Sequence, residues 1–341
     1  MKAAVYAENG VLEVVQRETP EPRPGWVRVA VSAVGICGTD LHMQRGSFGK
    51  VQGVQPGHEI AGVLDAVGDA VGDRLKLATG SLVAIEPVTS CGQCFHCRTG
   101  SYNRCLASRL FGVTARGGMA DYVAVPASCV YPLAAGLSAN VAALAEPAAV
   151  CARGVRLGQV TLNDCVAVLG AGTIGLLSIV IARASGAGQV FVTARHPHQA
   201  ALARHFGATE VFPSSAALMQ AVGDDTVDVV IETVGGTSTT LSDSVHLVRR
   251  GGRIVMLGVF DGSPGIPGLA FSTKELTLVG SNCYGHGPHL SDFAIGTQII
   301  DRHRDVLSAL VTHRFKLDQV AAAFATATDK ASGSIKVQIE P

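Results

Sequence analysis

Short alternating runs of hydrophobic and polar residues fill the chain from Met1 to about Ala143. Residues 26–36 (WVRVAVSAVGI) and 81–88 (SLVAIEPV) are typical, and Gly and Pro residues separate such runs from one another. The segment MKAAVYAENGVLEVV at the start alternates in the same way and predicts a hairpin. This pattern is typical of short β-strands joined by tight turns, so we expect an irregular, mainly β domain.

The pattern changes between about residues 157 and 281, where short apolar runs alternate with longer segments of helical pattern. The first two of these segments predict helices that end near Ser185 and Phe206. Strands that alternate with helices form a parallel sheet with crossover helices, so this region predicts an α/β domain. The expected strands are 165–170 (CVAVLG), 189–194 (QVFVTA), 227–234 (VDVVIETV) and 251–258 (GGRIVMLG).

The C-terminal tail departs from this alternation. Residues 306–315 (VLSALVTHRF) and 316–327 (KLDQVAAAFATA) predict two helices, and residues 334–340 (SIKVQIE) predict a final strand. Because the tail is not another strand–helix–strand unit, we expect it to pack against the first domain. The expected domains are 1–150 and 151–285, with 286–341 as the segment that returns to the first domain.

Composition and charge narrow the classes of function. The 341 residues are 48% hydrophobic and 16% charged, which argues against a disordered chain and allows two hydrophobic cores. Lys and Arg number 27, and Asp and Glu also number 27, so the net charge is zero. Because nucleic acid requires a basic surface, we do not expect a nucleic-acid partner.

The sequence also bears on the compartment. The segment MKAAVYAENGVLEVV lacks the long apolar region of a secretory signal. The longest apolar run, residues 165–181, is interrupted by Gly170, Gly172 and Gly175 and does not predict a membrane span. We expect a cytoplasmic protein without membrane association, in which the nine cysteines are free thiols or metal ligands rather than disulfides.

A glycine-rich loop follows the first strand of the α/β region. Gly170, Gly172 and Gly175 form Gly-x-Gly-x-x-Gly, with Thr173 and Ile174 between the last two glycines. In this motif the first glycine permits a tight turn, the second lets backbone N–H groups approach a pyrophosphate, and the third allows close helix packing. The loop predicts a dinucleotide site, and a glycine-rich turn without a ligand is the alternative.

The end of the second expected strand indicates which dinucleotide binds. NAD-binding sheets usually carry an acidic residue there, which accepts hydrogen bonds from the ribose hydroxyls. This chain has Ala194 instead, followed by Arg195 and His196, with His198 nearby. Cationic donors in place of a carboxylate favour the 2′-phosphate of NADP(H) over NAD(H). The alternative is an Arg195 that only points into solvent.

Four cysteines lie close together in a glycine-rich stretch. Cys91, Cys94, Cys97 and Cys105 have the spacing CxxCxxCx7C, which can surround one zinc ion with a tetrahedron of thiolates. Such a site has no open position, so it predicts a structural zinc ion. A ferredoxin-like cluster normally has another spacing and a following proline, and four unligated thiols are not expected in so small a loop.

A second set of candidate ligands is dispersed along the chain. Cys37 lies in GICGTDLH, His58 and Glu59 lie in PGHEIAG, and Glu146 lies in LAEPAAV. Any one of them alone would more often be a structural residue. Together they supply thiolate, imidazole and carboxylate groups, the mixed ligand set that leaves zinc an exchangeable position for a substrate.

These motifs together resemble the zinc-dependent medium-chain dehydrogenase/reductase family, essentially from end to end of the chain. Residues 57–71 (GHEIAGVLDAVGDAV) are similar to the GHE signature of that family, and the four-cysteine loop and LGAGTIG follow in the expected order. The resemblance implies a mainly β, GroES-like catalytic domain beside a Rossmann doubly wound parallel sheet. It also implies a small-molecule alcohol or ketone substrate and a homodimer or homotetramer.

Within the family, Glu146 in an EP context and residues 310–315 (LVTHRF) resemble the sorbitol, threonine and butanediol dehydrogenase branch. By this resemblance Cys37, His58 and Glu59 would hold the catalytic zinc. Glu146 would bind it directly or through a water molecule.

The resemblance extends to the substrate side of the site. Thr39 matches a hydroxyl residue that contacts the reacting oxygen, and His42 would be a later member of a proton path. Polyol enzymes of the branch tend to carry an Arg-Tyr pair where this chain has Ser281 and Asn282, so an open-chain sugar alcohol loses an expected partner. Butanediol-like, cyclitol-like and other secondary alcohols are equally open as substrates. Candidates for the wall of the substrate pocket are Phe48, Phe111 and Tyr284.

The sequence thus predicts an oxidoreductase that interconverts a secondary alcohol and its ketone with NADP(H), with one catalytic and one structural zinc ion per chain. A zinc-free quinone or enoyl reductase of the same superfamily is the nearest alternative, and Cys37, His58 and Glu59 argue against it. A non-catalytic NADPH-binding protein would not need these ligands. Only the cysteine loop suggests a zinc-ribbon nucleic-acid binder, and the zero net charge argues against that.

Overall fold

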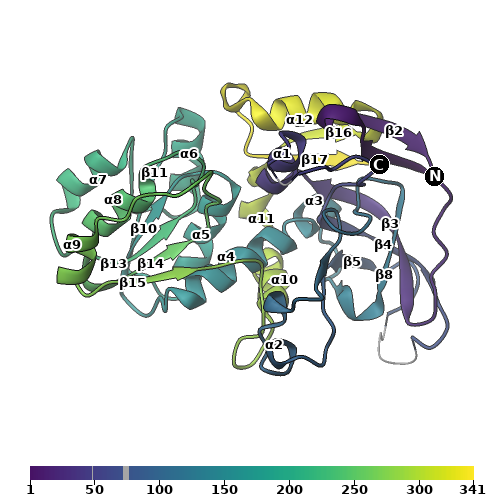
Figure 1. Ribbon diagram of the computed structural model, residues 1–341, viewed down its shortest axis with the longest axis horizontal. Coiled ribbons are helices and arrows are strands. Elements are labelled where there is room, and N and C mark those ends of the chain that lie inside the picture. The colour runs from purple at the N-terminus through teal and green to yellow at the C-terminus, as the bar shows by residue number, and fades with distance from the viewer. Residues whose placement is uncertain (48, 72–76) are drawn as a thin grey trace. The chain divides into compact units, whose positions relative to one another are not determined.

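The computed structural model describes residues 1–47, 49–71 and 77–341. These residues form two compact units, coloured by residue number in Figure 1. Unit 1 comprises Met1–Glu146 together with Gly285–Pro341, and unit 2 comprises Pro147–Tyr284. Unit 2 is therefore inserted into the sequence of unit 1.

Unit 1 is built on a seven-stranded sheet that joins the early and the last strands of the chain. The strand order is β16-β17-β3-β4-β5-β9, and β8 also pairs with β3. β16 and β17 are parallel, and the other neighbouring strands are antiparallel. The strands are β3 (Trp26–Gly35), β4 (Glu59–Val67), β5 (Leu82–Ile85), β8 (Tyr122–Pro126), β9 (Val130–Pro132), β16 (Val311–Lys316) and β17 (Lys336–Glu340).

Smaller elements complete unit 1. The N-terminal segment forms the predicted hairpin, in which β1 (Lys2–Tyr6) pairs antiparallel with β2 (Leu12–Gln16). β6 (Val88–Thr89) pairs with β7 (Arg109–Leu110), and the loop between them carries the four neighbouring cysteines. The α-helices are α1 (Gly38–Gln44), α2 (Phe95–Arg98), α3 (Ala139–Ala142), α10 (Asp292–Arg302), α11 (Arg304–Leu307) and α12 (Val320–Thr328).

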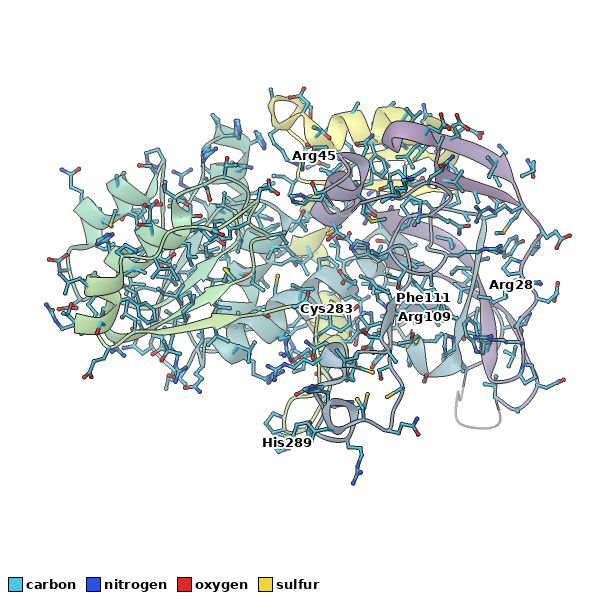
Figure 2. All side chains as sticks on the ribbon, in the orientation of Figure 1. Arg28, Arg45, Arg109, Phe111, Cys283 and His289 are labelled. Atoms are coloured by element: carbon cyan, nitrogen blue, oxygen red, sulfur yellow. The ribbon has the colours of Figure 1, made fainter. Side chains whose placement is uncertain are left out.

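The core of unit 1 lies between the sheet, the hairpin and α12. Tyr6 of β1 and Phe324 of α12 are both fully buried, and their rings meet edge-on with centroids 6.4 Å apart. Trp26 and Phe111 form a second edge-on pair at 6.2 Å, in the region where Figure 2 labels Phe111 beside Arg109. Aromatic pairs of this geometry stabilise a fold by more than the burial of their surface area alone. Here they connect segments that are distant in sequence.

One prediction for the tail is wrong. Residues 311–315 of the expected first helix belong to the strand β16, and only α11 and the short 3-10 turn Ser308–Leu310 precede it as helix. Half-buried and exposed side chains alternate along β16, and Val311 pairs with Lys336 in the parallel register. Strand pairing with β17 therefore overrides the helical pattern of this segment, which also contains two β-branched residues. The helix α12 and the final strand β17 are confirmed.

Unit 2 is a six-stranded parallel sheet in the order β12-β11-β10-β13-β14-β15. This is the 3-2-1-4-5-6 order of the Rossmann fold, so the predicted fold class is confirmed. The strands are β10 (Cys165–Leu169), β11 (Gln189–Thr193), β12 (Glu210–Phe212), β13 (Val227–Glu232), β14 (Val248–Met256) and β15 (Thr277–Gly280).

Helices cover both sides of this sheet (Figure 1). They are α4 (Ala145–Leu157), α5 (Thr173–Ala184), α6 (Pro197–His205), α7 (Ser215–Val222), α8 (Thr240–Leu247) and α9 (Gly268–Thr273). All five residues of β10 are buried, as a central strand with helices on both faces requires. None of the helices in the described part of the chain has the length and apolar character that a membrane span requires.

Candidate functional site

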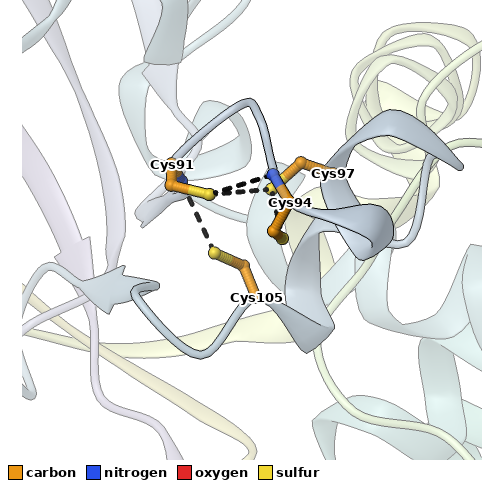
Figure 3. A group of neighbouring side chains, drawn as sticks. All are labelled: Cys91, Cys94, Cys97 and Cys105. Atoms are coloured by element: carbon orange, nitrogen blue, oxygen red, sulfur yellow. Dashed lines mark hydrogen bonds between the residues drawn. The ribbon is translucent and has the colours of Figure 1, made fainter.

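The four cysteines between β6 and β7 face one another (Figure 3). Their sulfur atoms all lie within 4.8 Å of one another. The Sγ atoms of Cys91 and Cys97 are 3.9 Å apart, and those of Cys94 and Cys97 are 3.5 Å apart. Zn–S bonds of about 2.3 Å in a tetrahedron separate the sulfur atoms by about 3.8 Å. The cluster therefore fits one zinc ion with four thiolate ligands.

Backbone N–H groups in this loop point at the sulfur atoms. The N–H of Cys94 donates to Sγ of Cys91 at 3.4 Å, and the N–H of Cys91 donates to Sγ of Cys105 at 3.5 Å. Hydrogen bonds from the N–H groups of Gln93 and Cys94 lower the pKa of the Cys91 thiol to about 6. Because the thiolate is the form that binds metals, these N–H groups prepare Cys91 to bind a cation. The pKa of the Cys94 thiol is instead raised, to about 11, by burial and by hydrogen bonds with the neighbouring thiols.

The dispersed candidates Cys37, His58 and Glu59 come together where β3 and β4 meet. The antiparallel register places Gly35, at the end of β3, opposite Glu59, the first residue of β4. Cys37 follows two residues after Gly35, and one ligand atom from each of the three candidates lies within 4.8 Å of the others. His58 and Glu59 are buried, and Cys37 is half-buried. Strand register therefore assembles a cluster that its spacing along the chain does not reveal.

Asp40 supports two members of this cluster, and the sequence analysis did not single it out. Its carboxylate accepts a hydrogen bond of 2.9 Å from the N–H of Cys37, the residue that caps the helix α1. Its other oxygen lies 3.8 Å from Nδ1 of His58, which is within the range of an electrostatic contact. Asp40 is fully buried. The available signal was an acidic residue at the third position of a helix that starts after Cys37.

Buried acidic groups surround the imidazole of His58. Burial alone would lower the pKa of His58, but the Asp40 carboxylate, the Cys37 thiol and Glu146 together raise that pKa well above its usual value. Glu146 is a buried residue in the first turn of α4 that lies outside the 4.8 Å group. Such an arrangement attracts a cation, so the residues fit a zinc ion held by thiolate, imidazole and carboxylate groups.

Thr39 and His42 lie on α1, beside this cluster. The hydroxyl oxygen of Thr39 is 3.8 Å from Sγ of Cys37. Because Thr39 and His42 are three residues apart on a helix, they lie on the same face of it. Both are half-buried. The helix therefore presents a hydroxyl group and an imidazole in succession next to the candidate metal ligands.

Lys336 is the second residue that the sequence analysis missed. Its ammonium donates to both carboxylate oxygens of Glu59, at 2.6 and 2.7 Å, and to the carbonyl of Ile36 at 3.1 Å. Lys336 is 2% exposed and Glu59 is 1% exposed. The alternating run SIKVQIE suggests a solvent-facing lysine, but β17 lies between β16 and β3 and is buried on both faces. The alternating pattern therefore gave no signal that this lysine is buried.

The glycine loop of unit 2 shows three different uses of glycine. Gly170 has a φ of +101°, which favours glycine, and a methyl group at Gly175 would overlap the carbonyl of Gly170. A methyl group at Gly172 would instead project into open space, with no atom within 4 Å. Gly172 is the N-cap of α5, and Thr173 and Ile174 start the helix without a side-chain cap. The loop can therefore direct backbone N–H groups and the helix dipole at a phosphate.

The end of β11 lies next to this glycine loop. Thr193, the last residue of β11, accepts a hydrogen bond of 2.9 Å from the N–H of Gly170. Ala194 is buried and Arg195 is exposed, and no ion pair of Arg195 occurs within the described residues. His196 is the N-cap of α6, and its ring stacks on that of His198 with centroids 5.4 Å apart. Ala194 stands at the position where NAD-binding sheets usually have a carboxylate.

Comparisons with known proteins agree with both halves of this description. The model of the alcohol dehydrogenase GroES-like domain matches residues 23–135, and the model of the zinc-binding dehydrogenase matches residues 173–298. The L-galactonate-5-dehydrogenase of Escherichia coli (strain K12) is 31% identical over 318 residues, which cover 91% of this chain and 90% of that protein. The chain belongs to the zinc-dependent medium-chain dehydrogenase/reductase family.

Two solved structures resemble this dehydrogenase along its whole length. One, from Sinorhizobium meliloti 1021 and bound to NADP, has a TM-score of 0.90 and 31% identity and covers 100% of this chain and 99% of its own. The other, an alcohol dehydrogenase from Escherichia coli CFT073 in complex with NADH, has a TM-score of 0.88 and 29% identity, with coverage of 100% and 99%. Zinc and a nicotinamide dinucleotide are thus the cofactors that the family implies, and the two structures contain different dinucleotides.

The three aromatic candidates for the substrate pocket of the dehydrogenase lie in different surroundings or outside the described residues. Phe48 lies outside the described residues. Tyr284 is fully buried. Phe111 lines a cavity of about 420 Å³ whose walls also include Trp26 and Tyr122, and none of the candidate zinc ligands is among its lining residues. The structure therefore gives Phe111 a place in the packing around Trp26.

Proposed function

We propose that this dehydrogenase interconverts a secondary alcohol and its ketone with NADP(H), on a substrate of the polyol, diol or cyclitol type. The observation that carries the proposal is the buried cluster of Cys37, His58 and Glu59 beside the hydroxyl of Thr39. Thiolate, imidazole and carboxylate ligands suit a zinc ion that keeps a position for substrate. The relative that acts on L-galactonate supports a polyhydroxylated substrate.

Each residue near the cluster has a role in this proposal. Cys37, His58 and Glu59 would hold the catalytic zinc, with Glu146 as a direct or water-mediated ligand. Bound zinc supplies a Lewis acid for the substrate oxygen, and bound NADP(H) supplies hydride chemistry at the nicotinamide C4. Thr39 exchanges a proton with the substrate oxygen, and His42 is the next group on the proton path, one helical turn away.

The other candidate residues would bind a metal ion or the dinucleotide and take no part in the reaction. Cys91, Cys94, Cys97 and Cys105 would hold a structural zinc that stabilises their loop. In the dinucleotide domain, residues 151–285, the loop of Gly170, Gly172 and Gly175 would bring the N–H groups of Thr173 and Ile174 to the pyrophosphate. Arg195 and His196 would bind the 2′-phosphate. Residues 1–150 and 286–341 would form the catalytic domain. We also propose a homodimer or homotetramer, because β15 leaves one edge of the six-stranded sheet open.

Steady-state kinetics with zinc analysis of the same sample test this proposal. Secondary alcohols, diols, cyclitols and the matching ketones are assayed with NADP(H) and with NAD(H) in parallel. We expect turnover that prefers NADP(H) and one zinc ion for each of the two clusters. Arg195→Ala should lower kcat/KM for NADP(H) by about 10- to 100-fold, because a charge-assisted hydrogen bond contributes about 1.5–3 kcal/mol.

The matched control is Arg204→Ala, which removes an exposed arginine in the last turn of α6. It should leave kcat/KM unchanged with both dinucleotides. An unchanged kcat/KM of Arg195→Ala with NADP(H), or a preference of the unaltered protein for NAD(H), would show that Arg195 only faces solvent. Full zinc content without turnover on the whole panel would count against the substrate class.

A further inference from the structure

The buried ion pair between Glu59 and Lys336 lies inside the candidate metal cluster. Lys336 is 277 residues away from Glu59 in the sequence, yet its ammonium contacts both oxygens of the carboxylate. The two side chains are 3% and 1% exposed. Glu59 therefore offers the metal only oxygen atoms that already accept hydrogen bonds from a cation.

The surroundings hold this pair in place from both sides. The carbonyl of Ile36 accepts a third hydrogen bond from Lys336, at 3.1 Å. On the other side, a methyl group at Gly35 would overlap the carboxylate of Glu59, so the backbone of Gly35 lies directly against that carboxylate. Glu59 therefore has no room on that side to turn away from Lys336.

An ammonium group and a zinc ion compete for the charge of one carboxylate. Electrostatic attraction is stronger in a buried site than in water, because the effective dielectric constant is lower. An ammonium at 2.6 and 2.7 Å from the two oxygens therefore draws away much of the charge that Glu59 could donate to zinc. Among the described residues no lysine or arginine forms a hydrogen bond with Cys37 or His58.

We infer that Lys336 keeps Glu59 a weak and exchangeable ligand of the catalytic zinc, which a substrate oxygen can replace. This inference rests on the proposed function, because it requires zinc at Cys37 and His58. Lys336 is a positioning residue that acts through Glu59 and needs no contact with the metal or the substrate. The C-terminal strand β17 thereby influences the metal site without supplying a ligand.

The test compares zinc retention in Lys336→Met with zinc retention in the unaltered protein. Without the ammonium, Glu59 gives its full charge to zinc, so release of the catalytic zinc to a chelator should slow by about tenfold or more. The zinc of the four cysteines serves as an internal reference and should leave at an unchanged rate. With cobalt(II) in the catalytic site, the visible absorption bands should shift, because they report the ligands of the metal.

Three further variants separate this effect from a structural one. Lys316→Met is the matched control, because the exposed Lys316 ammonium pairs with Glu340 at 3.3 Å on the neighbouring strand. Lys336→Arg keeps the positive charge and should restore the release rate and the cobalt spectrum. The double variant Lys336→Met/Glu59→Gln removes both charges and so leaves no unpaired buried carboxylate. It should release zinc faster than Lys336→Met does.

Several outcomes would overturn the inference. One is zinc release from folded Lys336→Met at the rate of the unaltered protein or faster. Another is equally slow release from the double variant. If Lys336→Met does not fold, Lys336→Gln takes its place.

The unaltered protein gives a check without any variant. A cobalt spectrum that does not change at saturating substrate would contradict an exchangeable Glu59. A purified protein that binds zinc only at the four cysteines would instead refute the proposed function.

Discussion

The loop of four cysteines and the cluster around Cys37 differ in how far apart their candidate ligands lie in the sequence. The loop takes all its candidate ligands from residues 91–105, and three of its four thiols are at least partly exposed. The other cluster joins Cys37, His58 and Glu59 and is supported by Asp40 and Lys336, all of them on or next to the sheet or α1. The first site therefore depends on one short segment, and the second depends on the register of β3, β4 and β17.

This difference predicts different roles. Four thiolates within one loop leave a metal no free position, so such a metal can only stabilise the loop. A buried site made by distant strands is as rigid as the sheet itself, which suits a metal whose position relative to a substrate must be exact to a fraction of an ångström. Changes in the two clusters should thus affect different measurements.

The largest effect is expected for Cys37→Ser. Loss of this thiolate should lower kcat/KM by at least about a thousandfold, because the Lewis acid contributes several kcal/mol to the transition state. Binding of NADPH, followed by its fluorescence, should persist, since the glycine loop belongs to unit 2. The melting temperature should change by only a few degrees. Turnover close to that of the unaltered protein would remove Cys37 from the catalytic site.

For Cys97→Ser we expect a loss of stability with little loss of turnover. A structural zinc contributes folding free energy, so the melting temperature should fall by roughly 5–10 °C, at about 2–4 °C for each kcal/mol. Zinc content should fall by about one ion per chain, and the folded fraction should keep its turnover number. A melting temperature equal to that of the unaltered protein would show that the loop does not need its metal.

A smaller effect is expected for Asp40→Asn, which keeps the shape of the side chain and removes its charge. Residues that orient a metal ligand typically contribute about 10- to 100-fold to metal affinity or activity. We expect a loss of this size in zinc affinity at the Cys37 cluster, measured by competition with a chelator. Asp65→Asn is the control, because Asp65 binds Arg28 on the surface. Equal zinc affinity in Asp40→Asn and Asp65→Asn would show that Asp40 does not support metal binding.

The sequence could predict those features whose residues are close together in the chain. The hairpin, four of the six strands of the Rossmann sheet and the grouping of the four cysteines all follow from local patterns, and the structure shows each of them. The roles of the candidate site residues stay predictions. Residues 311–315 were expected in a helix because apolar spacing in so short a segment does not separate helix from strand, and only pairing with β17 decides.

Asp40 and Lys336 were missed for a related physical reason. A charged residue in a sequence is normally assigned to the surface, because burial of an unpaired charge is costly. In the structure Asp40 lies against His58, and Lys336 is paired with Glu59. The partners of Lys336 lie at the opposite end of the chain, on or next to β3 and β4. No local pattern could show that Asp40 lies against His58 or that Lys336 lies against Glu59.

The insertion of unit 2 into unit 1 has a consequence for synthesis on the ribosome. Unit 2, Pro147–Tyr284, is complete before the final segment of unit 1, Gly285–Pro341, has been made. Domains generally fold as units while the chain emerges, so the Rossmann unit can fold first. The sheet of unit 1 must wait for β17, because this strand pairs with β3 and carries Lys336. A chain that stops before β17 would therefore have an intact dinucleotide fold and an unfinished candidate metal site.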